Sequence, residues 1–428
     1  MAADRGGARD RAPADATAAE AVVIGGGVAG LAMAVALGVG GVPTVLVDRA
    51  PPEAGGSPAA PPPSDGRTAA LLPEPVNVLR GLGVWESLEA GAAPLRRMRL
   101  VNERRGLAGG ETVEFDPGDA GAPDFGYNVA NDALRRALLE RLSGLDAVTH
   151  LRPAEMASVA FEPHRVAVRL ADGRRVVARL AVAADGRDSP TRAAAGISVS
   201  RWDYGQTALV CAIDHERPHG GVSTEFHRPG GPFTLVPMPG ERSGVVWVER
   251  TADALRFVAM ADAAFEAALE ERTRGVLGRV RLVAGARHAY PLDASLAARF
   301  HGPRLALIAE AAHGLHPIGA QGLNLSLRDV AALAEEVVDA WRVGLDIGAE
   351  DLLAAYERRR RPDAVARLYA TDLLNRATAT DSLLLHAARG LGLRLLDAAG
   401  PLKSALIRQG MSAVGGGAVP RLARGEPL

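Results

Sequence analysis

The first regular hydrophobic pattern in the chain is a short apolar run, a glycine-rich turn, a longer apolar run and a second short one. The pattern predicts a buried strand over 20–24, a helix over 29–39 and a second buried strand over 43–47. The sequence GGGVAG lies between the first strand and the helix. The folded part of the chain is therefore predicted to begin with a strand–turn–helix–strand unit.

This unit contains no charged residue between Ala21 and Val47, which raises the question of a transmembrane segment. Its seven glycines and Pro43 would leave backbone groups unsatisfied in lipid. The stretch also fits a signal peptide poorly, because acidic residues as well as arginines precede it. We expect a water-soluble unit without an integral membrane anchor.

The rest of the chain alternates between helical and strand-like patterns. Predicted helices lie over 75–82, 127–143, 253–259, 262–272, 323–342 and most of 349–410. Predicted strands lie over 159–170, 174–182 and 304–309, and residues 200–290 are β-rich. Residues 1–19, the Pro-rich stretch 51–64 and the tail after 410 show no regular pattern.

The composition is that of an ordinary globular protein, since 48% of the 428 residues are hydrophobic and 23% are charged. The length suggests two domains, or one large domain with insertions. A formal net charge of −1 gives no general electrostatic basis for binding nucleic acid. Cys211 is the only cysteine, so no disulfide forms within the chain, and its apolar neighbours predict a buried side chain.

The first motif with chemical meaning is the glycine turn of the opening unit. Gly25 permits a tight turn, Gly27 lets a pyrophosphate approach the backbone, and Gly30 lets helix and strand pack closely. The helix N-terminus offers unpaired N–H groups to phosphate, and Asp48 at the end of the second strand can accept hydrogen bonds from a ribose. These features together predict a dinucleotide site, without distinguishing FAD from NAD.

Two further motifs follow predicted strands. In VAADGRDSPTR, Asp185 and Gly186 come after an apolar strand, and a plain Asp-Gly turn would explain that stretch taken alone. In IAEAAHGLHPIGAQGLNLSLRD, Glu310 could reach a polyol, while Gly319 and Gly322 would let backbone approach a flat ring. The helix that follows would direct its positive end at the ring and stabilise a reduced, anionic form.

In this order and spacing, the three motifs resemble those of the aromatic-ring-hydroxylating flavoprotein monooxygenases of the para-hydroxybenzoate hydroxylase type. The strings DGRTAALL, FGYNVANDALRRALL, HRPGGPFTLVPMPG and PIGAQGLNLSLRDVAALAE are similar to those of the ubiquinone-biosynthesis hydroxylases. The resemblance covers residues 20–410 and implies an α/β fold with a Rossmann-like FAD-binding domain, an inserted β-rich substrate domain and a C-terminal helical region. The expected boundaries are 1–19 for a disordered N-terminus, 20–98, 127–195 and 287–345 for the FAD-binding domain, 99–126 and 196–286 for the substrate domain, 346–410 for the C-terminal helices and 411–428 for a loose tail.

The resemblance also implies cofactor-binding roles for particular residues. These are Gly25, Gly27 and Gly30 at the FAD pyrophosphate, Asp48 at the adenosine ribose, Arg67 approaching the flavin, Asn131 facing the cofactor, Asp185 and Gly186 at a site for FAD and NAD(P)H, Glu310 at the ribityl chain, and Pro317, Gly319, Gln321, Gly322 and Asn324 beside the isoalloxazine.

The chain departs from the family's usual residues in three of these places. Ala309-Glu310 stands where the family usually has Gly-Asp. Ala320-Gln321-Gly322 stands where the family usually has Gly-Gln-Gly, with a glycine displaced to Gly319. Asp48 replaces a more frequent Glu, which is a mild change.

The activity implied is that of an FAD-dependent monooxygenase, which uses NAD(P)H as a transient co-substrate and O₂ to hydroxylate a prenylated phenol in ubiquinone biosynthesis. No side chain is assigned as a catalytic base. His313 and His316 lie on a turn without further nearby ligands, so no metal site is expected. We expect a cytoplasmic protein. Peripheral contact with the inner membrane, a homo-oligomer and a ubiquinone-biosynthesis complex are left open.

Other interpretations compete with this one. The same fold could hydroxylate a soluble aromatic compound, or the chain could be a non-catalytic flavin-binding subunit of a biosynthetic complex. A plain NAD-dependent dehydrogenase would be colourless as isolated. The basic run over 358–361 is expected to be a solvated helix face, with contact to an anionic membrane or partner surface as the second interpretation. The sequence leaves open the ring position that is hydroxylated and the choice between NADH and NADPH.

Overall fold

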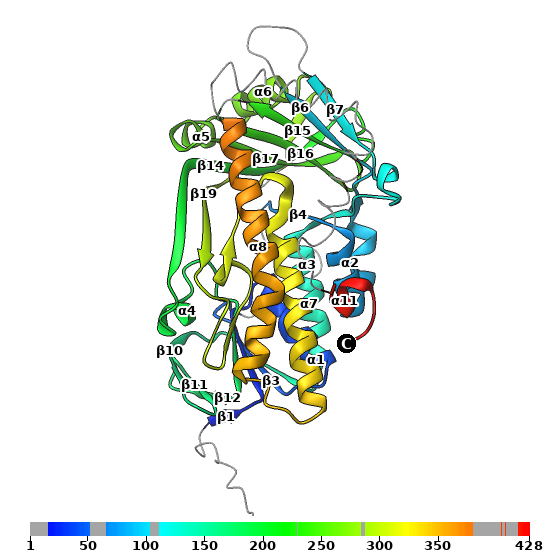
Figure 1. The fold of residues 1–428 in the computed structure, drawn as a ribbon. Coiled ribbons are helices and arrows are strands. Elements are labelled where there is room, and N and C mark those ends of the chain that lie inside the picture. The colour runs from blue at the N-terminus through cyan, green and yellow to red at the C-terminus, as the bar shows by residue number, and fades with distance from the viewer. Residues whose placement is uncertain are drawn as a thin grey trace, which may run out of the picture.

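The computed structural model describes residues 16–51, 66–102, 111–228, 230–283, 287–379, 404, 407 and 418–428. Much of the expected N-terminal disorder, of the Pro-rich stretch and of the helices expected beyond residue 379 therefore lies outside the described residues. The chain combines helices with parallel and mixed sheets (Figure 1). This arrangement confirms the predicted α/β fold class.

A six-stranded sheet carries the opening strand–turn–helix–strand unit. Its strands run in the order β20 (His301–Gly302), β21 (Leu305–Leu307), β13 (Leu180–Ala183), β2 (Ala21–Ile24), β3 (Thr44–Val47) and β9 (Val148–Leu151). Every pair except β20–β21 is parallel, so the carboxyl ends of five strands lie at one edge. All residues of β2, β3 and β13 are buried, as expected for parallel strands covered on both faces.

A nine-stranded sheet forms the other end of the molecule (Figure 1). Its strands run in the order β22 (His313–Gly314), β19 (His288–Ala297), β14 (Val199–His215), β17 (Arg242–Arg250), β16 (Gly231–Met238), β15 (Val222–Arg228), β6 (Arg97–Asn102) and β7 (Glu111–Phe115), with β18 (Val280–Leu282) paired to β14. Helices α5 (Thr251–Val258) and α6 (Asp262–Thr273) pack against it. The core between these helices and the sheet contains Trp247, whose ring centroid lies 4.2 Å from that of Phe257 and 5.7 Å from that of Phe265. Cys211 is buried in the same core, as predicted.

Two smaller sheets contain the other strands of the described residues. The four-stranded sheet contains β1 (Ala16–Ala18), β12 (Arg175–Ala178), β11 (Val166–Leu170) and β10 (Met156–Phe161). The three-stranded sheet contains β4 (Thr68–Leu71), β8 (Tyr127–Ala130) and β5 (Ala93–Pro94). The 3₁₀ turns are η1 (Trp85–Ser87), η2 (Glu89–Gly91), η3 (Pro117–Ala120), η4 (Ala309–Ala311) and η5 (Ile318–Ala320).

Helices join the two ends of the molecule. α1 (Val28–Val39) packs against α3 (Asn131–Ser143) and α7 (Gln321–Arg342). The long helix α8 (Glu350–Ala379) runs beside α7 and extends toward the nine-stranded sheet, where it contacts β15, β16 and β19 (Figure 1). The remaining helices whose bounds fall within the described residues are α2 (Pro73–Gly81), α4 (Pro190–Ala194) and α11 (Arg421–Arg424). Within the described part of the chain, no helix is both long and apolar enough to span a bilayer.

Tertiary contacts account for several differences from the predicted elements. The helix predicted over 127–143 begins only at Asn131, because β8 pairs with β4 before it. β1 is ordered by pairing with β12, although the sequence there predicts disorder. In the predicted loose tail, α11 packs on α2 and α7 and buries Leu422 completely. The predicted solvated face over 358–361 is wrong for Arg360, whose side chain is 4% exposed because it pairs with buried carboxylates.

Candidate functional site

Each of the three motifs has a predicted site residue at the carboxyl edge of the six-stranded sheet. Gly25 follows β2, and Asp48 follows β3. Asp185 lies just after β13, and Glu310 lies just after β21. Because β21, β13, β2 and β3 are consecutive neighbours, the sheet brings together residues from four separate parts of the sequence. Ligands of open parallel sheets bind at this edge.

The three glycines of the first turn have different requirements. Gly25 has a φ of 114°, and a Cβ there would lie 2.3 Å from the carbonyl oxygen of Ala184. A Cβ on Gly30 would lie 1.9 Å from the carbonyl oxygen of Gly25. A Cβ on Gly27 would meet nothing within 4 Å. The fold itself therefore requires glycine at Gly25 and Gly30, whereas at Gly27 only an external ligand would require it.

Asp48 is a buried carboxylate that remains ionised. The backbone N–H of Ala50 donates to its Oδ1 at 2.9 Å, Arg135 Nη2 lies 3.2 Å from its Oδ2, and His150 Nε2 lies 3.7 Å from the same oxygen. Burial would raise the pKa of Asp48, but the nearby His150 ring, the hydrogen bond from Ala50 and the guanidinium of Arg135 outweigh it and lower the pKa to about 2. Near neutral pH, Asp48 thus presents a charged acceptor beside the glycine turn.

Arg135 is a site residue that the sequence analysis missed. Its guanidinium donates to the carbonyl oxygen of Gly26 as well as to Asp48, so it lies across the glycine turn. Asn131 and Arg135 are four residues apart on α3 and share one face of that helix. That spacing was the signal available in the sequence.

Arg67 and Asn131 are joined through the backbone. The N–H of Asn131 donates to the carbonyl oxygen of Arg67 at 3.1 Å. The guanidinium carbon of Arg67 lies 5.3 Å from the ring centroid of Tyr290 on β19. Arg67 therefore links the start of α3 to the nine-stranded sheet. The buried Oδ1 of Asn131 has no hydrogen-bond partner among the described residues.

The second and third motifs are held together by arginines. Arg192, itself buried, donates to the carbonyl oxygen of Ala311 at 2.9 Å. Arg187 Nη2 lies 3.2 Å from the carboxylate of Glu310. Asp185 accepts from the N–H of Thr191 through Oδ2, and its buried Oδ1 has no partner in the described structure.

The loop before α7 contains two consecutive left-handed residues, Gly319 with a φ of 72° and Ala320 with a φ of 51°. Asn324 Nδ2 donates to the carbonyl oxygens of Ala70 at 2.7 Å and Ala320 at 2.8 Å, and its Oδ1 accepts from the N–H of Leu72 at 2.8 Å. The amide of Asn324 is thus engaged by the chain itself. It fixes the loop to β4 and does not face outward.

Two of the departures from the family's usual residues, both with alanine in place of glycine, have a structural consequence. Ala309 has a φ of 54° and Ala320 a φ of 51°. Both alanines occupy the left-handed region that favours glycine, so the backbone keeps an unusual conformation in spite of the Cβ.

A family model described as "FAD binding domain" matches residues 18–370 of the chain. The chain belongs to the FAD-binding domain family. Among its relatives is the ubiquinone hydroxylase UbiL of Rhodospirillum rubrum, which is 41% identical over 411 residues that cover 96% of this chain and 94% of the relative. The 3-demethoxyubiquinol 3-hydroxylase of Escherichia coli is 30% identical over 90% of this chain and 96% of the relative.

The fold is shared with solved structures of FAD-binding proteins. The structure of a variant of Klebsiella pneumoniae HpxO complexed with FAD matches with a TM-score of 0.73 at 20% identity, covering 93% of this chain and 100% of that one. At this identity, the match establishes the fold alone.

The site of this FAD-binding domain fits its cofactor on two structural grounds. First, four glycines at the predicted contact points face open space, because an added Cβ would meet nothing within 4 Å; they are Gly27, Gly186, Gly319 and Gly322. Second, the buried Oδ1 atoms of Asn131 and Asp185 lack partners among the described residues. Buried polar atoms without partners are uncommon in folded proteins, and a polar ligand would satisfy them.

Proposed function

We propose that this chain is an FAD-dependent monooxygenase that uses NAD(P)H and O₂ to hydroxylate the ring of a prenylated phenol in ubiquinone biosynthesis. The observation that carries the proposal is the near-full-length similarity to the Rhodospirillum rubrum ubiquinone hydroxylase. The edge of the six-stranded sheet supports it, because Gly27 and Gly186 face open space there and Asp48 is charged.

We assign the dinucleotide half of FAD to the first turn. Gly27 and the N-terminus of α1 would hold the pyrophosphate, with Gly25 and Gly30 shaping the turn. Asp48 would accept hydrogen bonds from the adenosine ribose. Arg135, which lies across the turn, would stabilise the phosphate charge.

We assign the flavin half to the other motifs. Glu310 would hold the ribityl chain, and the Oδ1 atoms of Asn131 and Asp185 would accept hydrogen bonds from the cofactor. Asp185 and Gly186 would also serve transient NAD(P)H binding. The loop that includes Pro317, Gly319, Gln321, Gly322 and Asn324 would lie beside the isoalloxazine, with the N-terminus of α7 favouring negative charge on the ring.

The substrate ring would lie against the inner face of the nine-stranded sheet. An apolar cluster there contains Ala208, Val210, Val248 and Leu292, with Tyr204, Val246 and Tyr290 packed against it. Tyr290 lies under Arg67, and Tyr204 packs edge-on against His316, with 5.1 Å between the ring centroids. The cluster thus spans from the Arg67 segment to the flavin loop, where a prenylated ring would be desolvated.

When bound, FAD would supply the redox chemistry that activates O₂, with NAD(P)H as the electron donor. The residues of the chain have two tasks. The apolar cluster excludes water from the reaction, and the position of the cluster beside the flavin loop orients the phenol.

The proposal is tested with purified protein, FAD, NADH or NADPH, ¹⁸O₂ and a short-chain prenylated phenol. We expect substrate-stimulated oxidation of one nicotinamide and a product heavier by one ¹⁸O atom, and neither with a Gly27→Asp variant. A labelled product from a soluble aromatic acid but not from the prenylated phenol would redirect the substrate assignment. Stoichiometric FAD without any substrate-stimulated oxidation would indicate a non-catalytic flavin-binding subunit.

A further inference from the structure

Two strained turns bracket the segment that we assign to the flavin. Ala309, at the start of η4, has a φ of 54°, and Ala320, at the end of η5, has a φ of 51°. The left-handed conformation is disfavoured roughly tenfold or more for a residue with a Cβ. Other contacts must therefore hold both turns in place.

Asp329 on α7 holds the first turn. Its Oδ2 accepts from the backbone N–H of Ala309 at 3.1 Å and lies 2.6 Å from Nε2 of His313, while its Oδ1 accepts from Nε of Arg360 at 2.8 Å. Burial alone would raise the pKa of Asp329, but His313 and Arg360 outweigh burial and hold that pKa below its usual range. Asp329 is completely buried, so its charge acts at full strength on these donors.

Arg367 on α8 holds the second turn through Gln321. Arg367 Nη1 donates to Oε1 of Gln321 at 2.7 Å. Gln321 Nε2 in turn donates to the carbonyl oxygen of Gly319 at 3.1 Å, one residue before Ala320. The position of this loop therefore depends on a side chain of the neighbouring helix.

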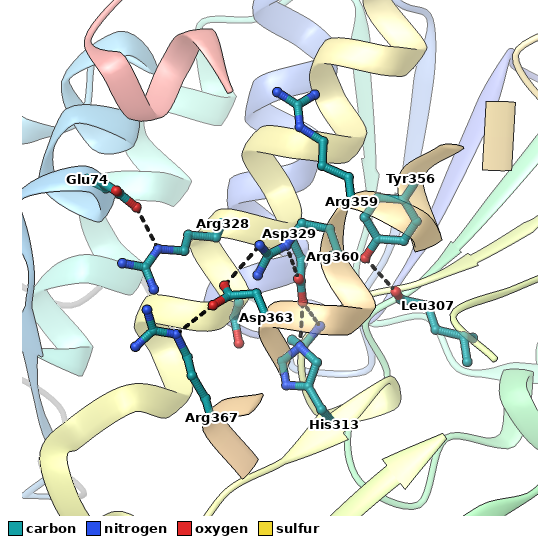
Figure 2. Close-up of polar contacts among 12 residues, drawn as sticks. Glu74, Leu307, His313, Arg328, Asp329, Tyr356, Arg359, Arg360, Asp363 and Arg367 are labelled. Atoms are coloured by element: carbon teal, nitrogen blue, oxygen red, sulfur yellow. Dashed lines mark hydrogen bonds and ion pairs between the residues drawn. The ribbon is translucent and has the colours of Figure 1, made fainter. Parts of the chain in front are cut away.

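A buried chain of alternating charges connects Asp329, which holds the first turn, with Arg367, which holds the second (Figure 2). Arg360 Nη1 donates to Asp363 at 3.1 Å, and Arg367 Nε donates to the same carboxylate at 2.9 Å. The three residues share one face of α8 because they are spaced by three and four positions. From Asp329 to Arg367, none of these four side chains is more than 6% exposed, and each charge lies beside one of opposite sign.

From this geometry we infer that Asp329 and Arg367 are positioning residues for FAD. Through them, α8 fixes the turns at Ala309 and Ala320 without touching the cofactor. The inference rests on the FAD site of the proposed function. A purely structural role for the same charges would stabilise the packing of α7 on α8 and leave FAD affinity unchanged. The positioning role and the purely structural role therefore predict different FAD affinities when either charge is altered.

Arg359 provides a matched control. It lies on the same helix and joins α8 to α7 through Glu335, 3.3 Å away, and Glu336, 3.5 Å away. Figure 2 shows its side chain directed away from Asp329 and Asp363. A lysine in place of Arg359 or Arg367 keeps the positive charge but loses the planar guanidinium that reaches two acceptors at once.

The experiment uses the full chain as apoprotein and measures the FAD dissociation constant by quenching of flavin fluorescence, the reduction potential of bound FAD and the melting temperature. We expect Arg367→Lys to weaken FAD binding about tenfold, the scale of one lost charge-assisted hydrogen bond, and to shift the potential. Arg359→Lys should leave both quantities at the wild-type value. Asp329→Asn should also weaken FAD binding, because a neutral amide cannot accept hydrogen bonds on both of its sides.

Glycine substitutions separate positioning from general stability. Ala320→Gly should restore FAD affinity in the Arg367→Lys background, and Ala309→Gly should restore it in the Asp329→Asn background, because glycine adopts these turns without restraint. Ala320→Gly should not restore FAD affinity in the Asp329→Asn background, and Ala309→Gly should not restore it in the Arg367→Lys background. Equal FAD affinity in Arg367→Lys and Arg359→Lys, or the absence of rescue at both ends, would overturn the inference. If the wild-type chain bound no FAD at all, the proposed function would fail with it.

Discussion

Gly27 and Gly30 belong to the same turn, yet the structure predicts opposite outcomes when each is replaced by alanine. At Gly27 the backbone has ordinary φ and ψ values of −71° and 175°, and an added Cβ meets nothing within 4 Å. Gly27 is also the N-cap of α1, where alanine is less favourable than glycine. The free energy of unfolding of apo Gly27→Ala should therefore fall by less than about 1 kcal/mol.

At Gly30 the same methyl group would lie 1.9 Å from the carbonyl oxygen of Gly25 and 3.2 Å from Cβ of Ala184. Because the first of these is a backbone atom, α1 would have to move away from β2. Overpacking of this kind costs about 3 kcal/mol or more. Gly30→Ala should thus be destabilised even without cofactor.

FAD binding should separate the two variants in the other direction. In Gly27→Ala the methyl group would occupy the approach of the pyrophosphate, and a misfit of about 1–3 kcal/mol weakens binding by about fivefold to 150-fold. The assay combines urea unfolding of the apoproteins with fluorescence titration of FAD. Wild-type FAD affinity in Gly27→Ala, or destabilisation of apo Gly27→Ala as large as that of Gly30→Ala, would refute this account of the turn.

Three further predictions concern the pH dependence, the thiol and the strained turns. Asp48→Asn should lower the melting temperature of the apoprotein at pH 5–7, as followed by circular dichroism, but much less near pH 2. The pKa of about 2 lies below the ordinary 3.8, so the stabilisation is present above the ordinary value and is lost as the pH falls through the folded one; an equal effect at both pH values would contradict this. Cys211 should not react with a thiol reagent in the native protein at pH 8, as measured by absorbance, because burial raises its pKa to about 12; rapid reaction before unfolding would disprove it. Ala309→Gly and Ala320→Gly in the wild-type background should each raise the free energy of unfolding by about 0.5–1 kcal/mol, since relief of left-handed strain exceeds the entropy cost of glycine; a decrease in urea unfolding would show that the turns are unstrained.

The parts of the site that the sequence revealed are those set by local pattern and sheet topology. The turn at Gly25 is followed at once by its helix, and the apolar runs before Asp185 and Glu310 identified strands whose carboxyl ends meet. Strand pairing distant in sequence was not readable in this way. The pairing of Leu71 with Tyr127 makes 127–130 a strand, although its composition is continuous with the helix that follows.

The buried charges were also beyond the sequence. Arg360, Asp363 and Arg367 have the spacing of one helix face, and that pattern is more often solvated. Their burial follows from the packing of α8 on α7, which places Asp329 opposite Arg360. The sequence also could not show that the amide of Asn324 fixes the loop to β4, because the position of that strand depends on tertiary packing.

The central claim is tested most directly by mass spectrometry of lipid extracts from a strain that lacks this protein. We expect the mature prenylated quinone to disappear and a precursor short of one ring oxygen to accumulate. Wild-type protein should restore the quinone, and the Gly27→Asp variant should not. Unchanged quinone in a strain without a second ring hydroxylase would contradict the account.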